Sequence, residues 1–430
     1  MTTTHETTPP VLSVRDLRVT VGAVPALRGV SFDVPAGQVT ALVGESGAGK
    51  SLTARAVLGL APHGARILGS VRLDGEEIAG AGPAVYRRLW GRRVAYVPQD
   101  ALAVLSPVHP VGGQLAAAVR SVARVSRAKA RARAVAALDA VGIADAARRA
   151  RALPHEFSGG MRQRAVIAMA LINGPRLIVA DEPTTALDPR VREQVLDALT
   201  RSREATGAAL LLITHDLPLA TAHADHAVVL YAGRVTETGP ARQIFTAPGS
   251  PYTAGLVASL PPGWGAGATG VEGGFDGPQR GAPASAPAGG AAAGPGDRVA
   301  GGSALGSDPA GGPAPGGPGA SGAGGPAAGA ADVGAGPASV PLPGDPAAGP
   351  RRDRWLPAIA GAPPSPVEVP AGCAFASRCP MAVGLCREVE PPLEDAGGGR
   401  LVACHRGSEL PVPTTTLFLG PPPPTGEPLS

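Results

Sequence analysis

One eight-residue stretch constrains the fold of this chain more than any other feature. The sequence Gly-Glu-Ser-Gly-Ala-Gly-Lys-Ser at 44–51 fits the pattern G-x-x-x-x-G-K-[S/T], and it follows VTALV (39–43), an apolar run that predicts a buried strand. In such a unit the backbone N–H groups of the loop converge on a phosphate chain, and the next helix directs its positive end there. The expected nucleotide-binding residues are Gly44, Glu45, Ser46, Gly47, Ala48, Gly49, Lys50 and Ser51.

Two acidic residues at the end of a second apolar run are candidates for metal binding and catalysis. Asp181 closes LIVAD (177–181), where its carboxylate can hold Mg²⁺ together with the hydroxyl of Ser51. Glu182 follows directly and is placed to accept a proton from an attacking water. The plainer alternative, that this pair is only the polar end of a strand, is weakened by the Pro-Thr-Thr-Ala-Leu-Asp sequence that comes next.

The rest of residues 11–260 predicts one folded α/β domain. Residues 11–21 and 29–34 alternate in polarity, as strands of an antiparallel edge do, and ALLLIT (209–214) is another buried-strand candidate. Residues 114–153 are rich in Ala, Val and Arg at helical spacing. Their apolar positions favour amphipathic helices with solvated basic faces over a nucleic-acid surface. Strands that alternate with helices indicate a largely parallel sheet.

Composition changes after residue 260. The chain has 61 Gly and 48 Pro among 430 residues, too many for one packed core, and residues 261–350 consist mainly of Gly, Ala and Pro. We therefore expect a disordered linker at 261–350, a small unit at 351–406, and flexible ends at 1–10 and 407–430. No apolar run approaches the roughly 18 residues needed to cross a bilayer, and the N-terminus does not resemble a signal peptide. The expected location is the cytosol, with membrane association through partners.

All four cysteines lie in the small C-terminal unit: Cys373, Cys379, Cys386 and Cys404. In a reducing compartment this clustering favours a metal site over disulfides. Pro380 directly after Cys379 is typical of iron–sulfur ligands, whereas the tight C-x₂₋₄-C pair of many zinc sites is absent. The expectation is one [4Fe–4S] cluster, with a structural Zn²⁺ or four independent thiols as the alternatives.

Further motifs identify the domain as similar to the ATPases of the ABC superfamily. Residues 158–164, SGGMRQR, match the signature sequence of that superfamily at a predicted helix start. The resemblance implies ATP and Mg²⁺ as ligands, and a head-to-tail dimer in which the signature contacts ATP held by the opposite subunit. It assigns the following residues: Ser158, Gly159, Gly160 and Gln163 to the signature; Gln99 to the Q-loop and the Mg²⁺ or water; Asp188 to the D-loop; and His215 to the γ-phosphate.

The closest resemblance is to the ATPases of oligopeptide/dipeptide importers. It extends over 11–261, including SPYTAGLVASLP (250–261), and over the Cys-containing unit at 351–406. It implies an energy-coupling subunit at the cytoplasmic face of the membrane. The partners would be two transmembrane permease subunits, a second and related ATPase subunit, and an extracellular solute-binding protein, with no role for nucleic acid. Relatives that carry nickel or other small solutes leave the cargo open, and a soluble non-transport ABC ATPase is the remaining alternative.

The early strand departs from this family in one respect. Family members usually stack an aromatic side chain on adenine there, but the matching residue is Val21, and no aromatic residue precedes Phe32. Stacking on a base contributes about 1–3 kcal/mol in other proteins. We therefore expect weaker contact with the base at this position.

Overall fold

The computed structural model describes residues 9–100, 103–184, 187, 189–260, 359–411 and 417–418. These residues belong to one compact unit, in which the chain up to 260 and the C-terminal segment pack together. The predicted linker at 261–350 and the proposed D-loop residue Asp188 lie outside the described residues. Among the helices described, none combines the length and apolar character needed to cross a membrane.

A four-stranded antiparallel sheet forms the N-terminal edge, as the alternating sequence predicts. Its order is β2-β1-β4-β5, with β1 at Leu12–Val21, β2 at Val24–Val34, β4 at Arg66–Leu73 and β5 at Glu76–Glu77. Leu12 and Val14 alternate in β1, as do Leu17 and Val19 after a register shift, and all four are buried in one core with helix α1 (Lys50–Val57). This sheet therefore supports the loop from which α1 begins.

The second sheet is the core of the domain. Its order is β11-β12-β10-β9-β3-β8-β7-β6, and the five strands from β9 to β6 are parallel. Every residue of β3 (Val39–Val43), β7 (Leu177–Asp181) and β8 (Ala209–Ile213) is buried. A strand that is covered on both faces has a continuous apolar sequence. The positions of these three strands could therefore be predicted from the sequence. The neighbouring strands are β6 (Val94–Val97), β9 (His226–Tyr231) and β10 (Arg234–Pro240).

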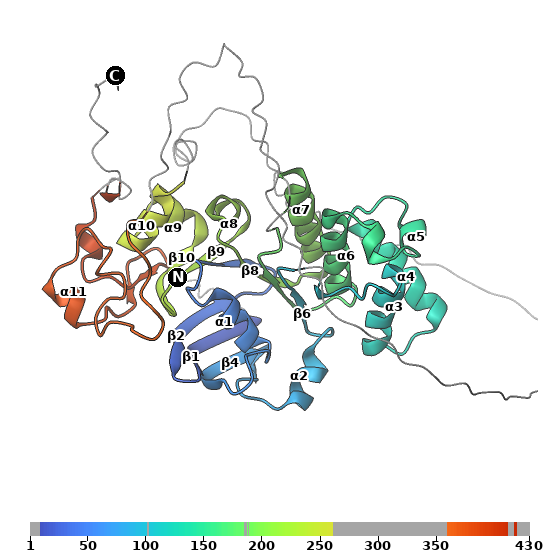
Figure 1. Cartoon of the computed structure of the whole chain (residues 1–430), viewed down its shortest axis with the longest axis horizontal. Helices are drawn as coiled ribbons and strands as arrows, with labels where there is room; N and C mark the ends of the chain where they lie inside the picture. Colours follow the sequence, from blue (N-terminus) through green and yellow to red (C-terminus); the bar gives the residue numbers. More distant parts are fainter. Residues whose placement is uncertain are drawn as a thin grey trace, which may run out of the picture. The chain divides into compact units, whose positions relative to one another are not determined.

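Helices pack around this sheet and form a helical subdomain beside it (Figure 1). In α4 (Arg127–Ala140), Ala130, Ala134 and Leu138 recur every four residues and are buried, while most of the arginines are exposed. The amphipathic interpretation of residues 114–153 is confirmed. The remaining helices are α2 (Pro83–Leu89), α3 (Val111–Val122), α5 (Ala146–Arg149), α6 (Gly159–Leu171), α7 (Pro189–Thr206), α8 (Leu217–His223), α9 (Ala241–Thr246) and α10 (Pro251–Ala258).

The C-terminal extension, residues 359–411 with 417–418, adds to the core sheet and lies beside α9, α10 and β10 (Figure 1). It contains α11 (Gly384–Glu388), β11 (Glu394–Asp395) and β12 (Leu401–Val402). Strand β12 pairs antiparallel with β10, with Val402 opposite Glu237. The Glu237 carboxylate is fully buried and accepts hydrogen bonds from the N–H groups of Gly249 and Ser250, at 2.8 and 3.1 Å. The extension is thus part of the same folded core.

An aromatic cluster holds the extension against the ATPase domain. Phe375 of the extension packs edge-on against Tyr231 and Tyr252, with ring centroids 5.4 and 5.3 Å away. Glu390 of the extension pairs with two arginines of the domain, Arg28 at 2.9 Å and Arg234. Buried aromatic contacts supply most of such a docking energy, because partly exposed ion pairs contribute little.

Replacement of Phe375 by Ala tests this attachment. Since the ring is buried against both tyrosines, the free energy of unfolding should fall by about 3–5 kcal/mol. Chemical denaturation of the full chain measures it, and Leu385→Ala on the half-exposed face of α11 is the control, with an expected loss within about 0.5 kcal/mol. Equal stability of the two variants would show that the extension does not share the core of the domain.

Candidate functional site

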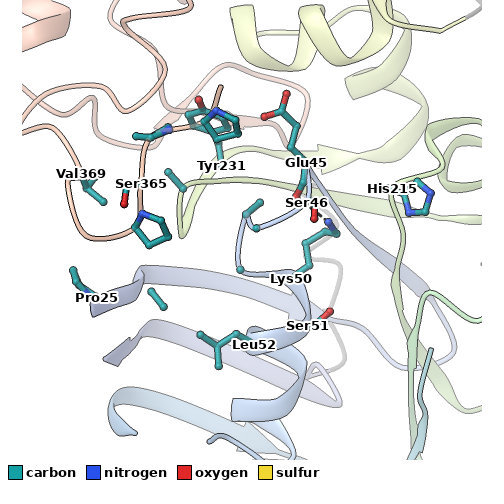
Figure 2. Close-up of a pocket in the computed structure, with 18 of the residues that line it drawn as sticks. Pro25, Glu45, Ser46, Lys50, Ser51, Leu52, His215, Tyr231, Ser365 and Val369 are labelled. Atoms are coloured by element: carbon teal, nitrogen blue, oxygen red, sulfur yellow. Dashed lines mark hydrogen bonds between the residues drawn. The ribbon is translucent and has the colours of Figure 1, made fainter. Parts of the chain in front are cut away.

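The candidate site lies where neighbouring parallel strands end. The 44–51 loop follows β3, Glu182 follows β7, and His215 follows β8 after one residue. Because β8 lies between β3 and β7, these segments meet at one edge of the sheet. They line a cleft of about 880 Å³, which is large enough for a nucleotide. Figure 2 shows Lys50 and Ser51 at its centre and His215 at one end.

The loop at 44–51 requires glycine at two closely packed positions. Gly44 has φ 148°, and a Cβ there would lie 2.2 Å from the carbonyl oxygen of Leu230. Gly49 has φ 104°, and a Cβ would lie 2.6 Å from Leu27. Both positions combine a left-handed backbone with a steric exclusion, so only glycine fits without rearrangement. The loop backbone is therefore fixed by the strands around it.

Lys50 is the first residue of α1 and directs its ammonium group back over the loop. Its Nζ donates to the carbonyl oxygens of Gly44 and Glu45 at 2.8 and 3.0 Å. Burial lowers the pKa of Lys50, while the nearby carboxylates of Glu182, Asp181 and Glu45 oppose that shift. A nearly buried cation at the start of a helix is suited to binding a polyphosphate. The attraction to the negative phosphates compensates the ammonium group for its lost contact with water.

Ser51 and Asp181, the two expected Mg²⁺ ligands, are in direct contact. The Ser51 hydroxyl donates to Oδ1 of Asp181 at 3.0 Å, and the hydroxyl of Tyr96 on β6 donates to Oδ2 at 3.1 Å. Burial, followed by the charge of Asp181, raises the pKa of Tyr96 to about 12, so Tyr96 remains a hydrogen-bond donor at neutral pH. Hydroxyl and carboxylate oxygens are the ligands that Mg²⁺ prefers. The sequence did not identify Tyr96, which is brought to Asp181 only by the β6–β7 pairing.

The three catalytic candidates converge on one carboxylate. Gln99 Nε2 donates to Oε2 of Glu182 at 2.9 Å, and His215 Nδ1 lies 3.2 Å from Oε1. Glu182 has φ 47°, a left-handed conformation that is uncommon for this residue type, and its N–H donates to the carbonyl of Ile213 at 2.9 Å. Such backbone strain often accompanies functional positions. The carboxylate is thus placed to orient a water with Gln99 and His215 around it.

The signature residues occupy a different place. Ser158 caps α6 by accepting the N–H of Met161 at 3.3 Å, and Gly159 and Gly160 form the first turn, as the sequence predicts. A Cβ at Gly160 would lie 2.3 Å from Val191 of α7, so glycine allows the two helices to approach. Gln163 is buried in α6. Neither Ser158 nor Gly159 is among the residues that line the cleft, so within this chain the signature does not join the loop at 44–51.

The other end of the cleft has an unexpected lining. Val21 packs against the core of the antiparallel sheet and is not among the residues that line the cleft. Pro25 and Ala26 line it instead, together with Tyr231 and residues 363–366 and 369 of the C-terminal extension. Sequence reasoning missed this contribution, because about a hundred residues separate the extension from the domain.

The four cysteines line one narrow pocket between the extension and β10 and α10. Burial raises the pKa of Cys373, Cys379 and Cys404, the last to about 11, and the neighbouring thiols add to each shift. Within the described part of the chain, no group of three or more His, Cys, Asp or Glu side chains could hold a metal ion. The described geometry therefore supports neither the expected [4Fe–4S] cluster nor its zinc alternative as a preformed site.

Comparison with known proteins gives two family matches. The family described as ABC transporter matches residues 27–185, and the oligopeptide/dipeptide transporter C-terminal region matches residues 236–268 and 345–386. The chain is 34% identical over 406 residues to the probable peptide ABC transporter ATP-binding protein y4tR of Sinorhizobium fredii, covering 93% of this chain and 96% of that protein.

Two further relatives are oligopeptide transport ATP-binding proteins named OppD. The protein of Mycobacterium tuberculosis is 48% identical over 257 residues, which cover 59% of this chain and 42% of that protein. The protein of Escherichia coli is 41% identical over 255 residues, which cover 58% of this chain and 76% of that protein. The match thus spans less than half the length of the mycobacterial relative.

Replacement of Glu182 by Gln should separate binding from catalysis. We expect ATP affinity to stay nearly unchanged and ATP turnover to fall by about 10²–10⁴-fold, because the water loses its base while the phosphate contacts remain. Equilibrium binding and phosphate release measure the two quantities.

Two variants serve as references for this experiment. Glu193→Gln makes the same chemical change at an exposed site on α7 and should leave turnover unchanged. Lys50→Ala removes the cation that binds the phosphates and should lose binding itself. Turnover by Glu182→Gln equal to that of the wild type would show that Glu182 is not the catalytic base.

Proposed function

Because the chain belongs to the ATP-binding proteins of the ABC transporter family that act in peptide transport, we propose that it hydrolyses ATP to drive a peptide importer. The observation that carries this proposal is the placement of Glu182 between Gln99 and His215, beside the Lys50 loop. The loop binds the phosphates and Glu182 accepts the proton of the attacking water. Ser51 and Asp181 would hold the Mg²⁺, which neutralises charge on the phosphates.

A second ATPase subunit completes the site in this proposal. The signature residues Ser158 and Gly159 lie at the start of α6, where the N-terminus of a helix can bind the γ-phosphate of a nucleotide. Since they are outside the cleft of their own chain, the nucleotide they contact belongs to the opposite subunit, which we take to be a related but different chain. Closure of this dimer on ATP, and its reopening after hydrolysis, would be the power stroke.

An apolar groove supports docking to a membrane permease. It has a volume of about 370 Å³ and lies between β6 and helices α3 and α6. Leu60, Trp90 and Val104 line it and are more than a third exposed, which is unusual for large apolar side chains. Gln99 is only five residues from Val104, so a permease helix in this groove would be linked to the catalytic site. The chain would then be peripheral at the cytoplasmic face, with two permeases and an external binding protein as partners.

The cargo is proposed to be di- or oligopeptides, because the C-terminal region matches that of the oligopeptide/dipeptide transporters. Cells that lack this gene should regain uptake of a labelled tripeptide when they express the wild-type chain, and should not regain it with Glu182→Gln. Uptake of labelled Ni²⁺ by the same cells is the competing measurement. Recovery of nickel uptake without peptide uptake would overturn the choice of cargo, and recovery of neither would overturn the importer role.

We further propose that the four cysteines, which form no preformed metal site in the described part of the chain, rearrange to bind a [4Fe–4S] cluster. The common pocket that they line is the supporting observation, together with Pro380 after Cys379. A cluster is larger than a single ion, so its ligands stand farther apart than the ligands of zinc do. When bound, the cluster would cross-link the loops of an extension whose own secondary structure is short.

Metal analysis of protein purified without oxygen tests the cluster. About four iron and four sulfide per chain are expected, falling to background in Cys386→Ser, whose side chain is buried in the pocket. Zinc at one per chain would favour the alternative site. Neither metal, in a protein whose denaturation shows an attached extension, would refute the proposal.

A further inference from the structure

The extension forms one wall of the nucleotide cleft. Residues 363–366 and 369 line the cleft together with Pro25 and Ala26 of β2. Figure 2 shows Val369, Ser365 and Pro25 grouped at one side of Lys50, with His215 on the other side. The segment makes a turn, in which the N–H of Glu368 donates to the carbonyl of Ser365 at 3.0 Å.

One arginine fixes the start of this wall relative to the phosphate-binding loop. Arg378 donates through Nη1 and Nη2 to both carboxylate oxygens of Glu45, at 2.7 and 3.0 Å. It also donates to the carbonyl oxygens of Ala360 and Ile359, at 2.9 and 3.2 Å, and to the Tyr231 hydroxyl at 3.1 Å. These contacts use all five N–H groups of the guanidinium. The Arg378 side chain is only 5% exposed and that of Glu45 is 23% exposed, so the ion pair is largely shielded from water.

Glu45 is held from two sides by C-terminal elements. Its carboxylate binds Arg378, and its N–H donates to the hydroxyl of Tyr252 on α10 at 2.9 Å. Tyr231 also lines the cleft, but its ring is 2% exposed and covered by Tyr252 and Phe375. Tyr231 therefore supports the wall and does not present a face to a ligand.

We propose that residues 363–366 and 369 of the extension form the subsite for the base of the bound purine nucleotide, with Arg378 as the positioning residue. This inference rests on the proposed ATPase function. The triphosphate must lie on the Lys50 loop with its terminal phosphate toward Glu182 and His215, so the base lies at the opposite end of the cleft. There the available surfaces are proline rings and the Val369 side chain, which can cover the flat face of a purine by apolar contact.

The subsite replaces the aromatic stacking that Val21 does not provide. The side chains of the extension that line it are apolar apart from Ser365, whose Oγ accepts the N–H of Val367 at 3.3 Å. An apolar surface of this kind contacts the face of the purine ring and makes few hydrogen bonds to the polar groups at its edge. The affinities for ATP and GTP should therefore depend on this subsite to a similar degree. The affinity for inorganic triphosphate, which has no base, should not depend on it.

A matched pair of variants in the full chain tests the base subsite. Val369 lines the cleft, while Val367, two residues earlier, is 70% exposed and does not. Val369→Ser should weaken the binding of Mg-ATP by about threefold to tenfold, and Val367→Ser should leave it unchanged. Both variants should bind inorganic triphosphate as the wild type does. Equal ATP affinity in the two variants, or an equal loss of triphosphate binding in Val369→Ser, would overturn the proposal.

Arg378→Lys tests the positioning role. The variant keeps the charge but cannot make the two-oxygen contact with Glu45 and the carbonyl contacts together. The ratio of ATP affinity to triphosphate affinity should fall, and an unchanged ratio in a folded variant would refute the role. Should Arg378→Lys fail to fold, the Val369 and Val367 pair still decides. Failure of the wild type to bind ATP would refute the ATPase proposal. Normal ATP binding by Val369→Ser would refute only the proposal of a base subsite.

Discussion

The functional geometry depends on the parallel pairing of β3, β7 and β8. Because β8 lies between the other two, the loop after β3, the carboxylates at the end of β7 and the histidine after β8 emerge at the same edge. Hydrogen bonds then join the segments, with Ser51 on Asp181 and Gln99 on Glu182. A shift in any of these strand pairings would move the loop at 44–51 away from Glu182, so the proposed chemistry depends on the register of three apolar strands.

The second constraint is the attachment of the C-terminal extension to this arrangement. Strand β12 continues the sheet through β10, the aromatic cluster closes over β9 and α10, and Arg378 links the extension to Glu45 of the phosphate-binding loop. An ion pair that is largely shielded from water, as this one is, is costly to break from one side, because an unpaired charge remains. The extension is therefore joined to the loop at 44–51 through direct contacts, and the groove near Trp90 would receive the proposed permease.

The sequence predicted the elements whose determinants are local. The apolar runs at 39–43 and 177–181 are strands with those bounds, and the motif residues Lys50, Asp181 and Glu182 lie together as expected. Contacts between segments that are distant in the sequence could not be predicted from local sequence patterns. Arg378 is 333 positions from Glu45, and nothing in the residues around it indicates that partner. Val21 was chosen by motif position as the residue facing the base, but the turn after β1 directs Pro25 and Ala26 to the cleft instead.

We propose that ATP hydrolysis at this site is coupled to peptide import, and the coupling itself can be measured. The chain would be reconstituted in vesicles with its two permeases and partner ATPase, and ATP turnover followed as binding protein and peptide are added. We expect a rise in ATP turnover that requires peptide-loaded binding protein and is accompanied by peptide accumulation inside the vesicles. ATP turnover that does not change when binding protein and peptide are added, with no peptide accumulated in the vesicles, would contradict the proposed coupling.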